Sequence, residues 1–200
     1  MVNNTDKGVG DILGSSRYTY PDGSDFAWRD ITSEVRTRGV GATDPVWTQI
    51  GTTVFYAYAF DVNDVAWFNY HVPHDIVPNS RVFFHTHWLT NGTSTNSVKW
   101  QFEYCYARGF NQDAFNVASP VTATAEEAAS GVAYQHMVTE TEGQQLTNLD
   151  EPDGLIQLKI TRLTNGGSEN ADTVYMLTSD IHYQSTEKGT YGKAPNFYTG

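Results

Sequence analysis

The chain is poor in three things: cysteine, long apolar runs and positive charge. Its single cysteine, Cys105, permits no internal disulfide, so the fold must rest on packing and hydrogen bonding. No run of about 18 apolar residues occurs, and the first sixteen residues lack the apolar core of a secretory signal, so we expect no membrane helix and no signal peptide. Twelve Lys and Arg stand against 23 Asp and Glu, giving a net charge of −11. This balance argues against nucleic acid and against anionic membranes as partners.

Apolar and aromatic residues instead alternate with polar ones along most of the chain. The longest such run, 98–108, places Val98, Trp100, Phe102, Tyr104 and Tyr106 on one face of a strand. The run 155–163 alternates in the same way. Strands are predicted at 54–60, 65–71, 81–88, 98–108, 132–140, 155–163 and 173–184. Only the alanine-rich stretch 124–130 favours a short helix.

These runs, separated by turn sequences, predict an all-β fold. We expect a jelly-roll or β-sandwich of roughly eight antiparallel strands over residues 45–186. Residues 1–44 are expected to form an N-terminal arm and residues 187–200 a C-terminal arm, each polar but carrying isolated aromatic side chains. Such aromatics suit docking onto the chain's own domain or onto a neighbouring subunit. The candidate interface residues are Tyr18, Tyr20, Phe26, Trp28, Tyr191, Phe197 and Tyr198.

Two histidines form the sharpest chemical feature. His85 and His87 are two residues apart on a predicted strand, so their imidazoles face the same way, as metal ligands do. The same pair opens the motif of cupins, the metal-binding jelly-roll enzymes, but the glutamate expected three or four residues later is missing. Packing or hydrogen bonding is therefore the favoured role, with His85 and His87 as weak candidates for an ion. We expect no bound metal, no cofactor and no catalytic residue.

Other chemistry-bearing residues favour structural roles. Cys105 is expected to be a small buried or half-buried strand residue rather than a nucleophile. Glu103 is the carboxylate that a glycoside hydrolase would use, but a solvated strand face explains it better. Four tryptophans would make a sugar-stacking platform if they were exposed, although tryptophans of a strand-rich protein lie mostly in the core. They are Trp47, Trp67, Trp88 and Trp100.

The middle of the chain resembles a group of tailed-bacteriophage virion proteins. The resemblance rests on WFNYHVPHD at 67–75, RVFFHTHW at 81–88, VKWQFEY at 98–104 and SDIHYQ at 179–184, and it covers roughly residues 45–190. It implies a β-sandwich protein on a phage particle, often trimeric, with no catalytic residue. An acidic sandwich with aromatic arms agrees with an assembly role, because arms that order on binding bury a large shared surface.

The first hypothesis is therefore a structural virion protein. It would be a cement or decoration protein that binds the outer head surface. Its partners would be other copies of itself, in a homotrimer, and the major capsid protein or another virion protein. The first alternative is a receptor- or glycan-binding module of a tail or head fibre. The second alternative is a cupin-type metal-dependent enzyme built around His85 and His87.

Overall fold

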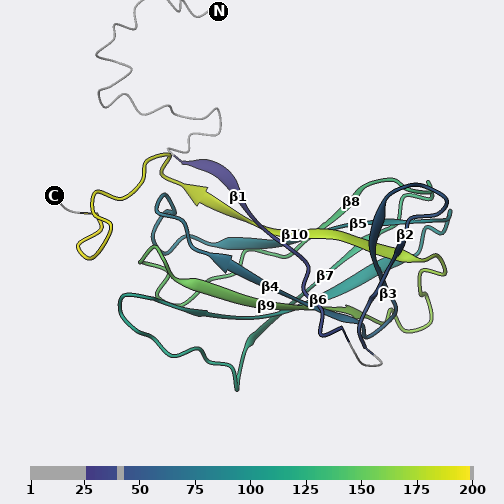
Figure 1. Cartoon of the computed structure of the whole chain (residues 1–200), viewed down its shortest axis with the longest axis horizontal. Helices are drawn as coiled ribbons and strands as arrows, with labels where there is room; N and C mark the ends of the chain where they lie inside the picture. Colours follow the sequence, from purple (N-terminus) through teal and green to yellow (C-terminus); the bar gives the residue numbers. More distant parts are fainter. Residues whose placement is uncertain (1–25, 40–42, 199–200) are drawn as a thin grey trace, which may run out of the picture.

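The computed structural model describes residues 26–39 and 43–198, and all regular structure within them is β (Figure 1). The strands are β1 (Ala27–Ser33), β2 (Val46–Gln49), β3 (Tyr56–Phe60), β4 (Val65–His71), β5 (Val82–Thr90), β6 (Ser97–Ala107), β7 (Val121–Ala128), β8 (Met137–Glu140), β9 (Leu155–Leu163) and β10 (Val174–Ser185). Over these described residues no helix is long and apolar enough to cross a membrane. The predicted fold class, an all-β sandwich, is confirmed.

Two antiparallel sheets pack face to face. One runs in the order β2-β3-β10-β5-β8, with β1 also paired to β10, and the other in the order β4-β9-β6-β7. Figure 1 shows them as two layers, with β1, β10 and β5 above β4, β9 and β6. Several pairs of neighbouring strands are far apart in sequence, as when β5 pairs with β10 and β1 pairs with β10, so the larger sheet holds the two ends of the domain together.

Strand β10 organises the larger sheet because it pairs along both edges. One edge is taken by β5, from Val174 opposite Thr90 to Tyr183 opposite Val82. The other edge is shared, since β3 pairs with residues 174–176 and β1 pairs with residues 179–185. The register with β5 shifts between Met176 and Thr178, so Leu177 is the extra residue of a bulge. The bulge falls where the partner on the shared edge changes from β3 to β1.

The inward faces of both sheets form one aromatic core. Its largest fully buried side chains are Trp88, Trp100, Tyr70, Phe60, Phe68, Phe84 and Phe102, with Ile156, Leu158 and Ile160 beside them. The ring of Phe60 meets that of Trp100 edge-on at 5.5 Å, and Phe84 lies 4.7 Å from Tyr104. Aromatic pairs in these geometries add about 0.5–1.5 kcal/mol each to the gain from burial. The face assigned to 98–108 from its alternation is the buried one.

A hydrogen-bonded chain also joins the two sheets through this core. The hydroxyl of Tyr70 on β4 donates to Ser179 on β10 at 2.8 Å, and Ser179 Oγ donates to the carbonyl of His85 at 2.6 Å. Burial raises the pKa of the Tyr70 phenol well above its ordinary value, so it stays a neutral donor. The chain fixes β5 against β10 at the level of His85.

The predicted helix at 124–130 is wrong. Residues 124–128 belong to β7, which pairs with β6 from Val121 opposite Tyr104 to Ala128 opposite Ser97. Their side chains alternate, with Ala123 and Ala125 turned partly inward and their neighbours exposed. Pairing along the whole of β6 outweighs the helix preference of alanine, which is only a weak local bias. With β1, β2 and β7 added, the described residues contain ten strands rather than roughly eight.

The sheet also begins earlier than residue 45. Residues 27–33, placed in the N-terminal arm by the sequence, form β1 and pair with β10 from Ala27 opposite Ser185 to Ser33 opposite Ser179. This stretch therefore docks on the chain's own domain. Its inward residue Ile31 packs against the main core, which explains why a mostly polar segment holds to the sheet.

Candidate functional site

An open cleft lies beside the bulge of β10. It has a volume of about 820 Å³ and is lined by Thr32, Ser33, Glu34, Val35, Trp47, Tyr58, Leu177 and Thr178, which we call the β1–β3 groove. Since β1 leaves β10 at Ser33 and β3 joins it only at Met176, the edge of the sheet is open between them. Bulges commonly re-aim side chains beside functional sites. Here the bulge residue Leu177 lines the groove.

One wall of the groove is aromatic. Trp47 on the edge strand β2 is 58% exposed, although it is the largest side chain of the groove and a large apolar side chain is normally buried. Its ring lies 4.8 Å from that of Tyr58 and 6.2 Å from that of Tyr56, nearly parallel to the latter at 20°. The three rings form a strip supported from below by strand pairing, in which Trp47 stands opposite Tyr58. Trp47 and Tyr56 are therefore nearly parallel and offer an exposed stacking face, and Tyr58 lies edge-on to Trp47 beside them.

The opposite wall is polar. Thr32, Ser33 and Glu34 come from the end of β1 and the residues after it, and Thr178 comes from β10. The Thr178 hydroxyl donates to the Ser33 carbonyl at 3.1 Å, which ties β1 to the bulge. Hydroxyls act as donors and acceptors, and a carboxylate accepts only. The groove therefore combines an aromatic face with side chains that can hydrogen-bond to the hydroxyl groups of a ligand. Among the described residues that line it, one is charged, Glu34.

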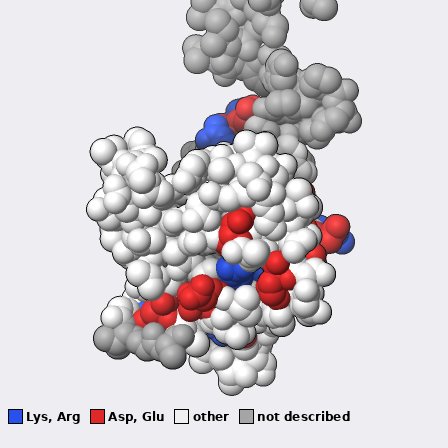
Figure 2. Space-filling model, turned by 90° about the vertical axis from the view of Figure 1, so that its right-hand side faces the viewer, with Lys and Arg blue, Asp and Glu red and all other residues white. Residues whose placement is uncertain are grey.

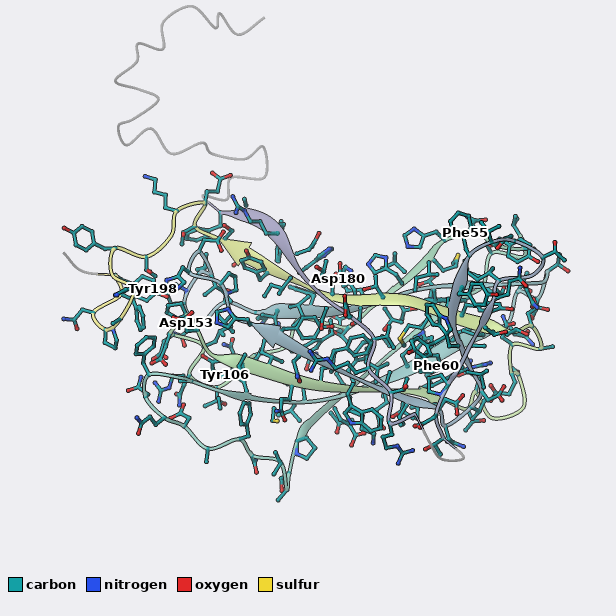
Figure 3. All side chains as sticks on the ribbon, viewed as in Figure 1. Phe55, Phe60, Tyr106, Asp153, Asp180 and Tyr198 are labelled. Carbon is teal, nitrogen blue, oxygen red and sulfur yellow. The ribbon has the colours of Figure 1, made fainter. Side chains whose placement is uncertain are left out.

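A second cluster lies on the outward face of the larger sheet, across β1, β10, β5 and β8. Strand register builds it: Asp180 on β10 stands opposite His85 on one side, and Glu140 on β8 stands opposite His85 on the other. His87 follows two residues after His85, and His182 follows two residues after Asp180. Figure 3 places Asp180 midway along the upper sheet.

The ring nitrogens and carboxylate oxygens of this cluster converge. His87 Nε2 lies 3.1 Å and His85 Nδ1 lies 3.6 Å from Asp180 Oδ1. The other nitrogen of His85 contacts Glu140 Oε2. His182 lies 2.7 Å from Asp30 Oδ1 and 3.4 Å from Glu140 Oε2. Three sets have ligand atoms close enough to hold one ion: His85, Glu140 and His182; His85, His87 and Asp180; and Asp30, Asp180 and His182.

The electrostatics of the cluster follow from these contacts. The hydrogen bond with Asp180 raises the pKa of His87 above its ordinary value, although burial acts in the opposite direction. Burial alone would raise the pKa of Asp180, but the bond with His87 and the charges of the nearby histidines hold that pKa below its ordinary value. Asp180 therefore carries its negative charge in the centre of the cluster.

The residues predicted to be interface contacts differ in their exposure to solvent. Tyr18 and Tyr20 lie outside the described residues. Trp28 is 52% exposed on β1, edge-on to Phe83 at 5.5 Å, and Phe26 immediately precedes that strand. Tyr191 and Tyr198 are exposed, whereas Phe197 is buried against Phe110 and His74 of its own chain. The Phe197 ring thus anchors the C-terminal segment and is closed to a partner.

The structure also separates the four tryptophans considered as a platform. Trp88 and Trp100 are fully buried, and Trp67 lies beneath the guanidinium of Arg38 at 5.4 Å. Of these four, only Trp47 is exposed, and its partners are Tyr56 and Tyr58 of β3, which no pattern in the sequence singles out. Glu103 pairs with Lys159 at 2.6 Å, and Cys105 is half-buried on β6, where burial raises the pKa of its thiol.

Comparison with known proteins adds only distant similarities. No family model matches the sequence, and no curated protein matches it. Among solved structures, a CBM6 from Clostridium stercorarium in complex with cellobiose is 11% identical at a TM-score of 0.39, over 78% of this chain and 92% of that one. A β-1,3-glucan-binding CBM6 from Bacillus halodurans is 8% identical at 0.32, over 80% and 96%. The structure of infectious bursal disease virus Gx strain is 12% identical at 0.29, over 76% and 40%. At these scores the similarities carry no inference about ligand or partner.

Proposed function

We propose that this chain is a glycan-binding β-sandwich module and that the β1–β3 groove is its binding site. The observation that carries the proposal is the exposed Trp47–Tyr58 pair facing hydroxyl and carboxylate side chains across one cleft. Sugar rings present C–H groups on one face and hydroxyls around the rim. Aromatic faces are electron-rich and attract the polarised C–H groups, while Thr32, Thr178 and Glu34 are placed to exchange hydrogen bonds with hydroxyls.

The charges favour a neutral glycan. Among the described residues, Glu34 is the only charged one that lines the groove, and the chain carries a net charge of −11. An acidic sugar would meet repulsion from both, whereas a neutral glycan loses nothing. In Figure 2, which faces the end of the molecule that carries β2 and β3, a band of acidic side chains with basic ones among them crosses the middle and lower part, and the rest of this face is mostly uncharged. The module would act by binding, with no catalytic step.

A microarray of neutral and acidic glycans tests this proposal. We expect the fluorescently labelled chain to bind a defined set of neutral oligosaccharides, and the Trp47→Ala variant to lose that set. Binding restricted to acidic glycans would contradict the assignment of the groove, and so would an array profile that Trp47→Ala leaves unchanged.

A virion assembly role is a second proposal, in which the chain decorates the outer head of a tailed phage as a homotrimer. One observation favours it: the turn between β2 and β3 exposes Val54 by 84% and Phe55 by 70%. Phe55 lies at the edge of the molecule, remote from Asp180 (Figure 3). Neighbouring apolar side chains on a turn suit burial in a partner subunit.

The oligomeric state tests this second proposal. We expect native mass spectrometry at about 10 μM to show a trimer for the wild-type chain and a monomer for the double variant Val54→Ser/Phe55→Ser, because removing a buried aromatic anchor typically costs an interface ~2 kcal/mol or more. A wild-type monomer at that concentration contradicts the homotrimer.

A further inference from the structure

We propose that His85, His87 and Asp180 form a binding site for a divalent transition-metal ion on the outward face of the larger sheet. The ligand atoms are His85 Nδ1, His87 Nε2 and Asp180 Oδ1. Both histidines come from β5 and the aspartate from the neighbouring β10, so all three sit on the central, doubly paired strands of the sheet. The proposal is independent of the glycan groove, which uses other residues.

The distances fit an ion of this kind. Zinc bound to imidazole and carboxylate lies about 2.0–2.2 Å from each ligand atom, so two ligands of a tetrahedral site are roughly 3.3–3.6 Å apart. Asp180 Oδ1 lies 3.1 Å from the His87 nitrogen and 3.6 Å from the His85 nitrogen. Small side-chain adjustments therefore suffice to coordinate an ion, without any change in strand pairing.

The second ring nitrogen of each histidine has a polar partner, as in metal sites. Ligating histidines usually have their second nitrogen held by a carboxylate or another polar group, which fixes the ring and its tautomer. His85 Nε2 contacts Glu140, so a proton there leaves Nδ1 with a free lone pair. That lone pair on His85 Nδ1 faces Asp180 Oδ1, which is also a hydrogen-bond acceptor. Because two acceptors repel each other, a cation or a proton between them stabilises this arrangement. His87 Nδ1 is held in turn by His136 Nε2 at 2.8 Å.

The charge of the site and its exposure to solvent also favour a bound cation. Asp30, Glu140 and Asp180 bring three carboxylates to the cluster, and over the described part of the chain no lysine or arginine forms an ion pair with any of them. The side chains of His85 and Asp180 are only 5% and 8% exposed, while that of His87 is 20% exposed. An ion would be held in a shielded position that opens to solvent at His87, where a water molecule can complete its coordination.

Two histidines and one carboxylate are ligands of intermediate softness, which suit Zn²⁺, Co²⁺, Ni²⁺ or Fe²⁺ better than Ca²⁺ or Mg²⁺. The test uses the full chain without a polyhistidine tag, stripped with a chelator and titrated with Zn²⁺ by calorimetry, then with Co²⁺ followed by visible absorption. We expect one Zn²⁺ per chain, and cobalt bands of the intensity that marks a four- or five-coordinate site. We also expect a rise in the thermal midpoint that a chelator reverses.

Variants assign the ligands. Asp180→Asn and His87→Ala are each expected to weaken Zn²⁺ binding at least ~100-fold, and Glu140→Gln about 10-fold, the range seen for residues that orient ligands. His71→Ala is the matched control, because His71 also contacts an aspartate, Asp153, at 3.2 Å but belongs to none of the three clusters found among the described residues. If Asp180→Asn fails to fold, the test rests on His87→Ala, because His87 is half-buried and its replacement disturbs the core less. No Zn²⁺ binding by the wild-type chain, or equal binding by wild type and His87→Ala, would overturn the proposal.

Discussion

Trp47→Ala is expected to weaken the binding of a neutral glycan by about 30-fold, which corresponds to ~2 kcal/mol. The indole is the largest exposed surface in the β1–β3 groove, and its removal takes away both the stacking face and the support of Tyr58. Isothermal titration with the best oligosaccharide from the array measures the change. Trp47→Phe keeps an aromatic face and should recover most of the affinity.

Trp28→Ala is the matched control for this titration. Trp28 is exposed to a similar degree, 52% against 58%, but lies on the outward side of β1 against Phe83 and lines no part of the groove. Its removal should leave the dissociation constant within about twofold. Equal losses in the two variants would mean that the tryptophans act through general stability or through a different surface.

Trp100→Ala is expected to lower the free energy of unfolding by ~3–5 kcal/mol, the usual cost of removing a fully buried large aromatic side chain. Trp100 lies on the inward face of β6, pairs with Arg162 on β9, and packs edge-on against Phe60 from the other sheet. Its loss leaves a cavity between the two sheets. Urea unfolding followed by circular dichroism measures the change, and a cost below about 1 kcal/mol would contradict the described core.

Substitution by phenylalanine separates packing from hydrogen bonding at the two core tryptophans. The Trp88 indole donates to Thr139 Oγ1 at 2.8 Å, whereas the buried Trp100 indole has no acceptor among the described residues. Trp88→Phe leaves Thr139 without its donor, so it should cost about 1 kcal/mol more than Trp100→Phe. Equal costs would mean that the Trp88–Thr139 bond contributes nothing net.

The fold class could be predicted because strand alternation is a local property. The runs 98–108 and 155–163 have a period of two, and their apolar faces are the ones buried between the sheets. Segments with weaker alternation were missed. In β1 the inward apolar residues are Ala27, which is buried but small, and Ile31, which packs against the core; in β7 the inward residues are alanines, so neither stretch shows the row of large apolar side chains that marks a strand.

The candidate sites depend on long-range pairing, which the sequence does not display. The spacing of His85 and His87 predicts that they share a face, and Asp180 and His182 show the same spacing on the last predicted strand. That these two strands are neighbours, with Asp180 opposite His85, follows only from the sheet order. The groove depends on the bulge at Leu177 and on the change of partner along β10, and neither leaves a pattern in the sequence.

The most direct test of the glycan-binding proposal is a nitrogen–hydrogen correlation spectrum that follows the five tryptophan indole signals during titration with the glycan. Each indole reports a different place: Trp47 the groove, Trp28 the outer side of β1, Trp67 the side of β4, and Trp88 and Trp100 the core. We predict that the Trp47 signal moves in a saturable way while those of Trp88 and Trp100 stay fixed. A saturable shift of the Trp28 or Trp67 signal with Trp47 unmoved, or no shift with any glycan of the array, would contradict it.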